Sequence, residues 1–227
     1  MKNNIRNAWN NFENDFKYLV KDIFKDGSLR FTLPWNPEYK TVSEVSPRLI
    51  EGYLLDQLMK RNDLTNTFVF ERVKSRDIGD VKVSYNFEGN MFEFHIDFKS
   101  SFINYRTRTL EYYQKHNLPG KRPGPTHPNL ISIKKLVEFN KDEKNKDIVI
   151  FMIDYDIIIN GRDIVIDLAP ALKFSKLFLL RDIHENNFNV GRLGKGQLQG
   201  TRLDDLKFRR RTKEEFIRIF HKHTFKM

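Results

Sequence analysis

The chain has 227 residues with a hydrophobic content of 39%, enough to bury a sizeable core, and we expect one domain that spans residues 1–227. Lys and Arg number 40 against 30 Asp and Glu, and the formal net charge of +10 favours a polyanionic partner, nucleic acid before an anionic membrane surface. The absence of cysteine excludes disulfides, thiolate zinc sites and cysteine nucleophiles.

The first segment of the chain predicts a helix rather than a targeting signal. Apolar residues recur at helical spacing through residues 5–24, without the unbroken apolar run of a signal peptide. No stretch of the sequence approaches the roughly 18 apolar residues of a membrane span. We therefore expect a soluble, cytoplasmic protein with no membrane partner.

A second helix is predicted after a connection that contains two prolines. Ser46 is suited to the N-cap of this helix and Pro47 to its first position. The apolar stripe of the helix runs through Leu54 and Leu58, and Glu51 lies on the flank of that stripe. From this flank a carboxylate can reach over the edge of the sheet that the helix covers.

Three segments rich in aromatic and β-branched residues follow and predict strands. They are residues 66–75, 80–87 and 91–101. Glycines separate the segments, so their order predicts an antiparallel meander. The polar segment after them is rich in proline and glycine in its second half, which we expect to be a long loop.

The remaining segments predict further helices and strands that complete the same core. Residues 129–144 read as a helix, and two buried strands, 147–159 and 163–169, are joined by a tight turn at Asn160-Gly161. A flexible, basic segment precedes a last helix that begins at Thr212, whose capping-box partner is Glu215. The predicted fold class is α/β of the α+β kind, with a central mixed sheet flanked by helices.

The hairpin formed by the second and third strand segments has two unlike faces. On its second strand, four apolar side chains alternate with Glu93, His95, Asp97 and Lys99. A turn at Glu88-Gly89 would place Asp80 opposite Asp97, and a turn at Gly89-Asn90 would place it opposite Lys99. In either register, two carboxylates and an ammonium group converge at the open end of the hairpin.

This convergence predicts a metal site. Two neighbouring carboxylates repel each other, and a divalent cation favours the ionised form of both, with Mg²⁺ the ion best suited to their hard oxygens. One or two bound Mg²⁺ ions would make a water molecule easier to deprotonate, and Lys99 would lie beside it. Together these groups are what metal-dependent phosphodiester hydrolysis requires.

Asp80 and the triplet Asp97-Phe98-Lys99 resemble the motif of the PD-(D/E)xK nuclease superfamily, mainly over residues 46–116. The resemblance implies a restriction-endonuclease-like core at about residues 46–168 with DNA-binding loop elaborations. It also implies that Asp80 and Asp97 are metal ligands and that Lys99 is the catalytic base or a water-orienting group. Glu51 would add a further catalytic acid and metal ligand. The chain departs from the motif at Gly79, where the family has proline.

Other interpretations of the same residues remain open. The triplet Asp80-Val81-Lys82, with Glu71 upstream, is a rival site on the preceding strand. The polar face of the hairpin can also be an ordinary solvated face, since alternation is typical of a half-exposed strand. His95 is either a metal ligand or base, or a partly exposed polar residue.

Two basic segments, residues 102–129 and 189–211, are predicted to contact DNA. Their Lys and Arg side chains can neutralise phosphates, and their Gln side chains can pair with adenine. The alternative is that both segments are solvated loops. The residues predicted to bind DNA are Arg106, Arg108, Lys121, Arg122, Arg192, Lys195, Gln197, Gln199, Arg202, Arg209 and Arg210.

Within the superfamily, the chain is similar to type II restriction endonucleases. The resemblance implies a homodimer that hydrolyses double-stranded DNA in a palindromic, AT-rich site, with no nucleotide cofactor. Two alternatives stay open: a repair or junction-resolving nuclease, and a non-catalytic nucleic-acid-binding protein.

Overall fold

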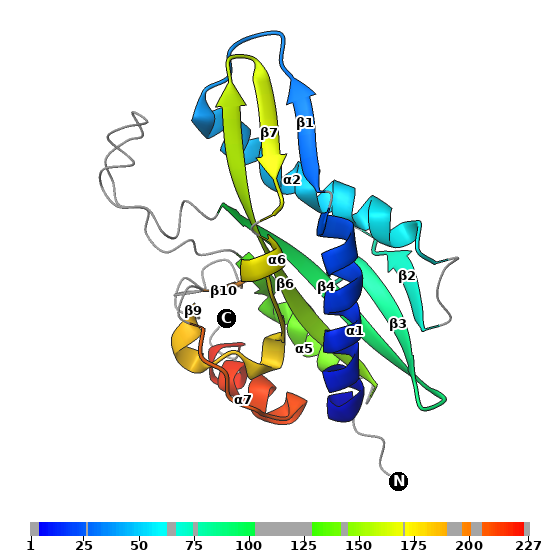
Figure 1. The fold of residues 1–227 in the computed structure, drawn as a ribbon. Coiled ribbons are helices and arrows are strands. Elements are labelled where there is room, and N and C mark those ends of the chain that lie inside the picture. Colours follow the sequence, from blue (N-terminus) through cyan, green and yellow to red (C-terminus); the bar gives the residue numbers. More distant parts are fainter. Residues whose placement is uncertain are drawn as a thin grey trace.

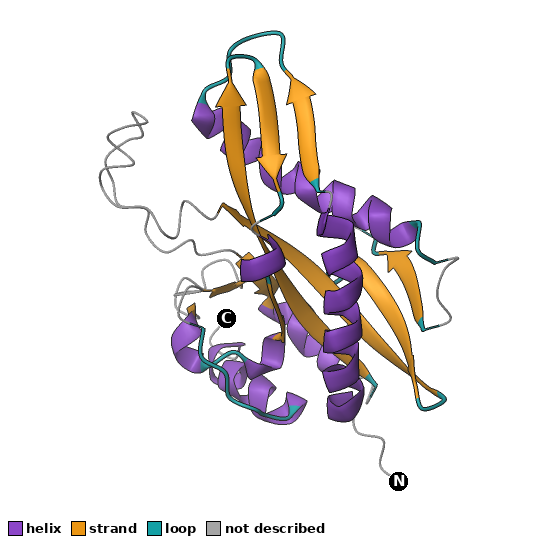
Figure 2. Cartoon of the chain, viewed as in Figure 1, coloured by secondary structure: helices purple, strands orange, loops and turns teal. Residues whose placement is uncertain are grey.

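A curled, mixed β-sheet flanked by helices forms the centre of the protein (Figure 1, Figure 2). This computed structural model describes residues 5–25, 27–62, 67–74, 77–102, 129–141, 145–169, 171–189, 197–200 and 206–224. In the described residues the sequence-based prediction of a mixed α+β fold is confirmed.

The main sheet is built around two parallel strands, β4 (Asn90–Phe102) and β6 (Lys146–Asn160). Beside β4 lie β3 (Val81–Phe87) and then β2 (Phe68–Arg72), which together form the predicted antiparallel meander. The other edge of β6 pairs with β7 (Asp163–Asp167) and with β8 (Lys176–Leu179). The β6–β7 hairpin confirms the predicted turn, in which Gly161 has a φ of 63°.

Helices cover both faces of this sheet. Helices α1 (Ile5–Lys25) and α2 (Tyr39–Met59) pack their apolar residues into one core, against the phenylalanines of β4. Helices α5 (Ile133–Lys141) and α7 (Lys213–Thr224) contribute to a second core on the opposite face. The short segments α6 (Ala171–Phe174), η1 (Leu180–Asp182) and η2 (Glu185–Asn187) connect the later elements. None of the described helices has the length and apolar character needed to cross a bilayer.

The predicted start of the second helix is wrong. Helix α2 begins at Tyr39 and includes Pro47 in its interior, rather than beginning at Ser46. The earlier turn buries Val42 in the first core, and this packing outweighs the local start signal of Ser-Pro. The Ser46 hydroxyl, which is buried, donates a hydrogen bond of 2.7 Å to the Val42 carbonyl instead of capping the helix.

Strands also replace three predicted loop or helix segments. The connection after the first helix contains β1 (Ser28–Thr32), which pairs with β7. The predicted helix 129–144 begins only at Ile133, because β5 (Asn129–Ser132) pairs with β10 (Gln197–Gly200). The basic segment expected to be flexible therefore contains a strand, which also pairs with β9 (Phe188–Asn189) and buries Leu198 in the second core.

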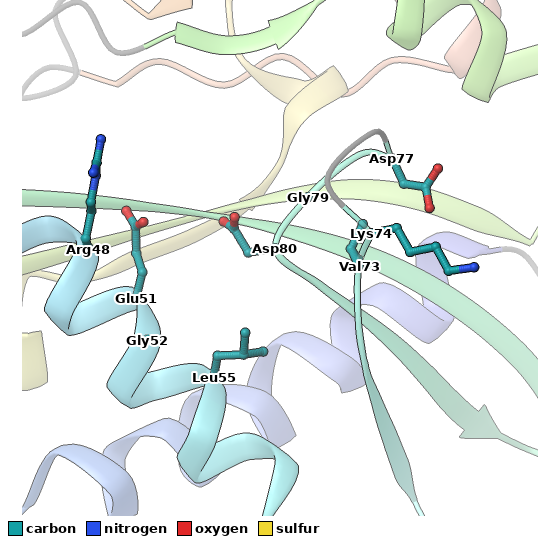
Figure 3. A pocket seen from close by; sticks show the side chains of 9 residues that line it. All are labelled: Arg48, Glu51, Gly52, Leu55, Val73, Lys74, Asp77, Gly79 and Asp80. Atoms are coloured by element: carbon teal, nitrogen blue, oxygen red, sulfur yellow. The ribbon is translucent and has the colours of Figure 1, made fainter.

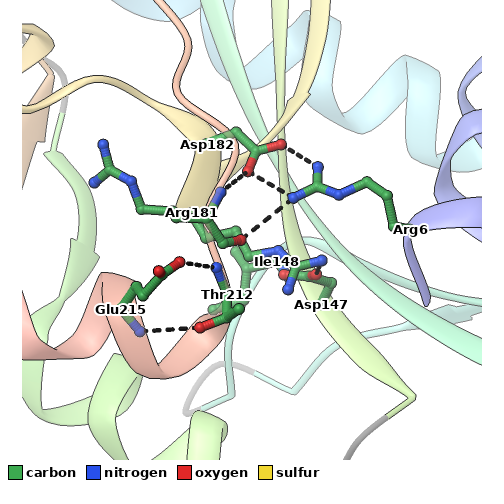
Figure 4. A network of polar contacts seen from close by, with 8 residues as sticks. Arg6, Asp147, Ile148, Arg181, Asp182, Thr212 and Glu215 are labelled. Carbon is green, nitrogen blue, oxygen red and sulfur yellow. Dashed lines mark hydrogen bonds and ion pairs between the residues drawn. The ribbon is translucent and has the colours of Figure 1, made fainter. Parts of the chain in front are cut away.

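A network of charged side chains ties α1 to η1 and to the start of α7 (Figure 4). Arg6 pairs with Asp182 through both carboxylate oxygens, at 2.9 Å for Nη2 and Oδ1, and the buried Asp147 pairs with Arg181 at 2.9 Å. The Thr212 amide donates to Glu215 at 2.7 Å, and the Glu215 amide donates to the Thr212 hydroxyl at 3.2 Å. This reciprocal pair confirms the predicted capping box of the last helix.

Candidate active site

The hairpin of β3 and β4 adopts the first of the two predicted registers. Val81 lies opposite Ile96 and Phe87 opposite Asn90, so the turn is at Glu88-Gly89. Both turn residues have positive φ values, 51° and 74°, as a two-residue hairpin turn of this kind requires. The phenylalanines of β4 fill the first core, while the alternating polar side chains lie on the face shared with α5.

Asp80 lies just before β3, and two hydrogen bonds hold it against β4. Its amide donates to the Ile96 carbonyl at 2.8 Å, and its Oδ2 accepts the Phe98 amide at 2.6 Å. Burial raises the pKa of Asp80, although the hydrogen bond from Phe98 and the charge of Lys99 oppose this effect. The carboxylate is thus fixed beside the triplet that the sequence predicted as its partner.

The glycine that replaces the proline of the family motif has a structural reason. Gly79 has a φ of +82°, and a Cβ at this position would lie 2.8 Å from the Ile96 carbonyl oxygen. No side chain fits that distance, and proline cannot adopt a positive φ. Gly79 therefore allows the loop before β3 to lie directly on β4, which places Asp80 at its position.

Asp97 and Lys99 form the centre of the polar face. Lys99 Nζ lies 2.7 Å from Asp97 Oδ2 in an ion pair, but no described group forms a hydrogen bond of normal geometry with this buried oxygen. Burial raises the pKa of Asp97 to about 7, although Lys99 acts in the opposite direction. The charge of Asp80 contributes to this increase, so one predicted metal ligand raises the pKa of the other.

Glu51 joins these groups from helix α2. Its Oε1 lies 3.5 Å from the Ser100 hydroxyl of β4. Burial, followed by the charge of Asp80, raises the pKa of Glu51 to about 7, while Lys99 lowers it and Asp97 raises it. Helix α2, the loop before β3 and β4 therefore bring three carboxylates and one ammonium group into one electrostatic environment.

A cavity of about 370 Å³ opens beside two of these carboxylates (Figure 3). Glu51 extends from α2 and Asp80 from the end of the loop toward the same space, and Arg48 lies beside Glu51 on the helix. Val73, Lys74 and Asp77 contribute to the wall formed by the loop. Polar groups that converge on a hollow of this size are typical of a binding site.

The donor set suits an open Mg²⁺ site better than a closed metal cage. Among the described residues, no three His, Asp or Glu side chains are close enough to enclose a metal ion. Mg²⁺ keeps several waters and is commonly held by one or two carboxylates and substrate phosphates. When ionised, the three carboxylates and Lys99 carry a formal charge of −2, which one divalent cation would balance. Asp80 and Asp97 are thus able to hold the ion, with Glu51 nearby.

The rival triplet lies in a different environment. Lys82 Nζ pairs with Glu71 at 2.8 Å across β3 and β2, where the Glu71 side chain is half exposed. This is an ordinary cross-strand ion pair at the surface, in which each charge already has its partner. Asp97, by contrast, is much more buried than Glu71, and it is influenced by a second carboxylate, that of Asp80.

His95 is engaged on both sides of its ring. Nδ1 lies 3.1 Å from the Ile78 carbonyl and Nε2 lies 2.5 Å from Glu93 Oε1. Burial would raise the pKa of Glu93, but the hydrogen bond and charge of His95, with Lys146, lower it. Both ring nitrogens already have a polar partner, so this geometry favours the alternative in which His95 is a polar residue of the strand over the one in which it is a metal ligand.

Most residues predicted to bind DNA lie outside the described residues. These are Arg106, Arg108, Lys121, Arg122, Arg192, Lys195 and Arg202. Gln197 and Gln199 belong to β10, and Arg209 and Arg210 are exposed ahead of α7. Arg209 lies 3.7 Å from Glu185 in an exposed ion pair, which leaves its guanidinium accessible.

Sequence reasoning missed Ser100 and Arg48. Ser100 interrupts the row of phenylalanines on the apolar face of β4, and this interruption was the available signal that a polar group meets the strand there. Arg48 had no signal, because only the true start and orientation of α2 place it beside Glu51. No protein-family model matches the chain, and no curated protein is significantly similar in sequence. The geometry of the site therefore carries the functional argument.

Proposed function

We propose that the protein is a Mg²⁺-dependent endodeoxyribonuclease of the PD-(D/E)xK kind, acting on double-stranded DNA. The observation that carries this proposal is the meeting of Asp80, Asp97 and Lys99, with Asp97 buried and its pKa raised to about 7. Asp80 and Glu51 line the cavity, and buried carboxylates with perturbed pKa values at a cleft are functional-site candidates.

The order of elements supports the same proposal. Helix α2 precedes the meander of β2, β3 and β4, and the chain then returns to place β6 parallel to β4. The resemblance implies a helix before these strands and a second helix after them, with one acidic residue at the start of a strand and the acidic-x-Lys triplet on the next. Helix α2 matches the first of these helices, and α5 follows β4 and β5 in the described residues. The proposed catalytic groups belong to the open end of the hairpin, and one of them, Asp80, lines the cavity together with Glu51 of α2.

Each side chain has a distinct role in this proposal. Asp80 and Asp97 would hold Mg²⁺, which supplies charge for the scissile phosphate and lowers the pKa of a bound water. Lys99, in its ion pair with Asp97, is an ammonium group with donors only, so it would orient the attacking water and offset charge on the phosphate. Glu51 would add negative charge from α2.

We further propose that the enzyme is a homodimer of the type II restriction class that cuts a palindromic, AT-rich site. One catalytic group per chain then serves both strands through two-fold symmetry. The exposed Arg209 and Arg210 would contact phosphates, and Gln197 and Gln199 would read bases from β10.

Digestion of plasmid DNA of known sequence tests the proposal directly. The wild-type protein with Mg²⁺ should release discrete fragments, and chelation of the metal or the change Asp97→Asn should abolish them. Cutting confined to branched or damaged DNA would favour a repair or junction-resolving nuclease. A shift of DNA mobility with no cleavage under any of these conditions would identify a binding protein.

A further inference from the structure

The loop that carries Asp80 is attached to β4 at three points. The Asp80 amide donates to the Ile96 carbonyl at 2.8 Å, and the Phe98 amide donates to Asp80 Oδ2 at 2.6 Å. The third contact comes from a side chain, since His95 Nδ1 lies 3.1 Å from the Ile78 carbonyl. A carbonyl oxygen can only accept, so His95 is the donor.

Of the three contacts with β4, the one made by His95 holds the loop on the far side of Gly79, and Lys135 of α5 donates to the preceding carbonyl, that of Asp77, at 3.1 Å. Gly79 lies between Ile78 and Asp80 with a φ of +82°, a residue type with wide backbone freedom. The His95 hydrogen bond fixes the carbonyl on the far side of this glycine. The Gly79 link is therefore held from both ends, by His95 at Ile78 and by the backbone of β4 at Asp80.

The His95 ring is itself held in one orientation. Nε2 lies 2.5 Å from Glu93 Oε1, and Lys146 Nζ lies 3.4 Å from the same oxygen. The Phe139 ring of α5 packs edge to face against the imidazole, with ring centroids 4.7 Å apart. These contacts direct Nδ1 at the Ile78 carbonyl.

We propose that His95 is a positioning residue, which directs the Asp80 carboxylate into the metal site by anchoring the Ile78 carbonyl. It touches neither metal nor substrate in this role, which deepens the proposed nuclease function and depends on it. Replacing a residue that orients a metal ligand through a hydrogen bond commonly lowers metal affinity or activity by about 10- to 100-fold. The Glu93–His95–Ile78 chain of contacts has this character.

Two amide substitutions separate the donor to Ile78 from the contact with Glu93. In His95→Asn the side-chain nitrogen can occupy the place of Nδ1, so the donor to Ile78 is kept and the Glu93 contact is lost. In His95→Gln the longer side chain can reach the place of Nε2, so the Glu93 contact is kept and the donor to Ile78 is lost. The two variants are matched in charge and in chemical group.

The experiment measures Mn²⁺ binding by calorimetry and the exchange rate of the Asp80 amide in the same folded proteins. His95→Gln should weaken Mn²⁺ binding by about 10- to 100-fold and speed exchange of the Asp80 amide, whereas His95→Asn should stay close to wild type in both. Wild-type affinity and exchange in His95→Gln would overturn the proposal, and so would equal losses in the two variants.

The exchange measurement also separates this proposal from the nuclease proposal. If the wild-type protein binds no Mn²⁺, the proposal that it is a metal-dependent nuclease is contradicted. The Asp80 amide still decides the role of His95 in that case, because faster exchange in His95→Gln alone supports the anchor and unchanged exchange contradicts it.

Discussion

The part of the chain that the structure describes contains two clusters of buried charge that are built in opposite ways. In the network between α1, η1 and α7, Asp147 and Asp182 each meet an arginine, and Arg211 adds a third cation 3.2 Å from Glu185. In the candidate site, three carboxylates share the single ammonium group of Lys99. The network is neutralised by the chain itself, whereas the site has an excess of negative charge.

This difference agrees with our proposal that the paired network serves folding and that the carboxylate cluster binds a metal ion. An ion pair in the interior is tolerated when each charge has a close partner, and removing one partner is costly. An excess of buried carboxylates destabilises the fold, and a bound cation, which we propose to be Mg²⁺, would offset the repulsion between them.

The largest expected effect is the loss of DNA cleavage caused by the substitution Asp97→Asn. The substitution nearly preserves volume but removes a charged metal ligand, so cleavage should fall by at least about 10³-fold, the upper range for loss of one preorganised electrostatic group. Gel-shift binding to the same DNA without Mg²⁺ should persist and serves as the control. Cleavage by this variant at the wild-type rate would show that Asp97 does not belong to the active site.

Lys99→Ala should reduce single-turnover cleavage by about 10²- to 10³-fold, since the ammonium group would offset charge that develops at the phosphate. Lys82→Ala is the matched control on the neighbouring strand, and it should cut like the wild type because Lys82 pairs with Glu71, away from the proposed site. Should Lys82→Ala and Glu71→Gln be inactive while Lys99→Ala cuts, the catalytic group is the rival triplet.

In the paired network, Arg181→Met should lower the free energy of unfolding by about 3–5 kcal/mol, because it leaves Asp147 buried without its arginine. Asp97→Asn should raise the free energy of unfolding of the metal-free protein at pH 8, because it removes an unfavourable buried charge. Denaturation by urea measures both. A similar loss of stability in both variants would contradict the claim that one cluster is neutralised and that the other has an excess of negative charge.

The pH dependence of Mg²⁺ binding should reveal the raised pKa values of Glu51 and Asp97, both about 7. Mg²⁺ must displace their protons below this pH, so its affinity should rise toward pH 8, by about tenfold per unit for each proton released. Without metal, both acids have folded-state pKa values above their unfolded values, so their contribution to stability declines between about pH 4 and 7. A calorimetric Mg²⁺ affinity that is flat from pH 6 to 8 would contradict these shifts.

The smallest expected effect is that of Thr212→Ala at the start of α7. Loss of the capping hydrogen bond should lower the free energy of unfolding by about 1 kcal/mol. Cleavage should be unchanged, since the cap belongs to the network between α1, η1 and α7 and not to the candidate site. A drop in cleavage rate with no drop in stability would show that α7 contributes to the site.

The candidate site was predictable mainly because a hairpin fixes its own geometry. Alternation on β4 and the parity of a two-residue turn placed Asp80 with Asp97 before any tertiary contact was known. The sequence could not decide between the two hairpin registers, because the register depends on which residues of the turn adopt a positive φ. Here Glu88 does so, a residue type that rarely does.

The features that sequence reasoning missed depend on tertiary contacts. The extra turns of α2 follow from burial of Val42, and β5 and β10 form because each provides the partner of the other. The loop from Ile78 to Asp80 lies on β4 through a glycine whose role is visible only against the Ile96 carbonyl. Local sequence patterns contain none of these long-range partners.

Thermal unfolding at pH 8, with and without Mg²⁺, tests the central claim that the carboxylate cluster is built for a divalent cation. Mg²⁺ should raise the unfolding temperature of the wild-type protein, since an ion at 100 times its dissociation constant adds about 2.7 kcal/mol of stability. Asp97→Asn should unfold at a higher temperature than the metal-free wild type and should no longer respond to Mg²⁺. An equal response of the two proteins to Mg²⁺ would contradict the account.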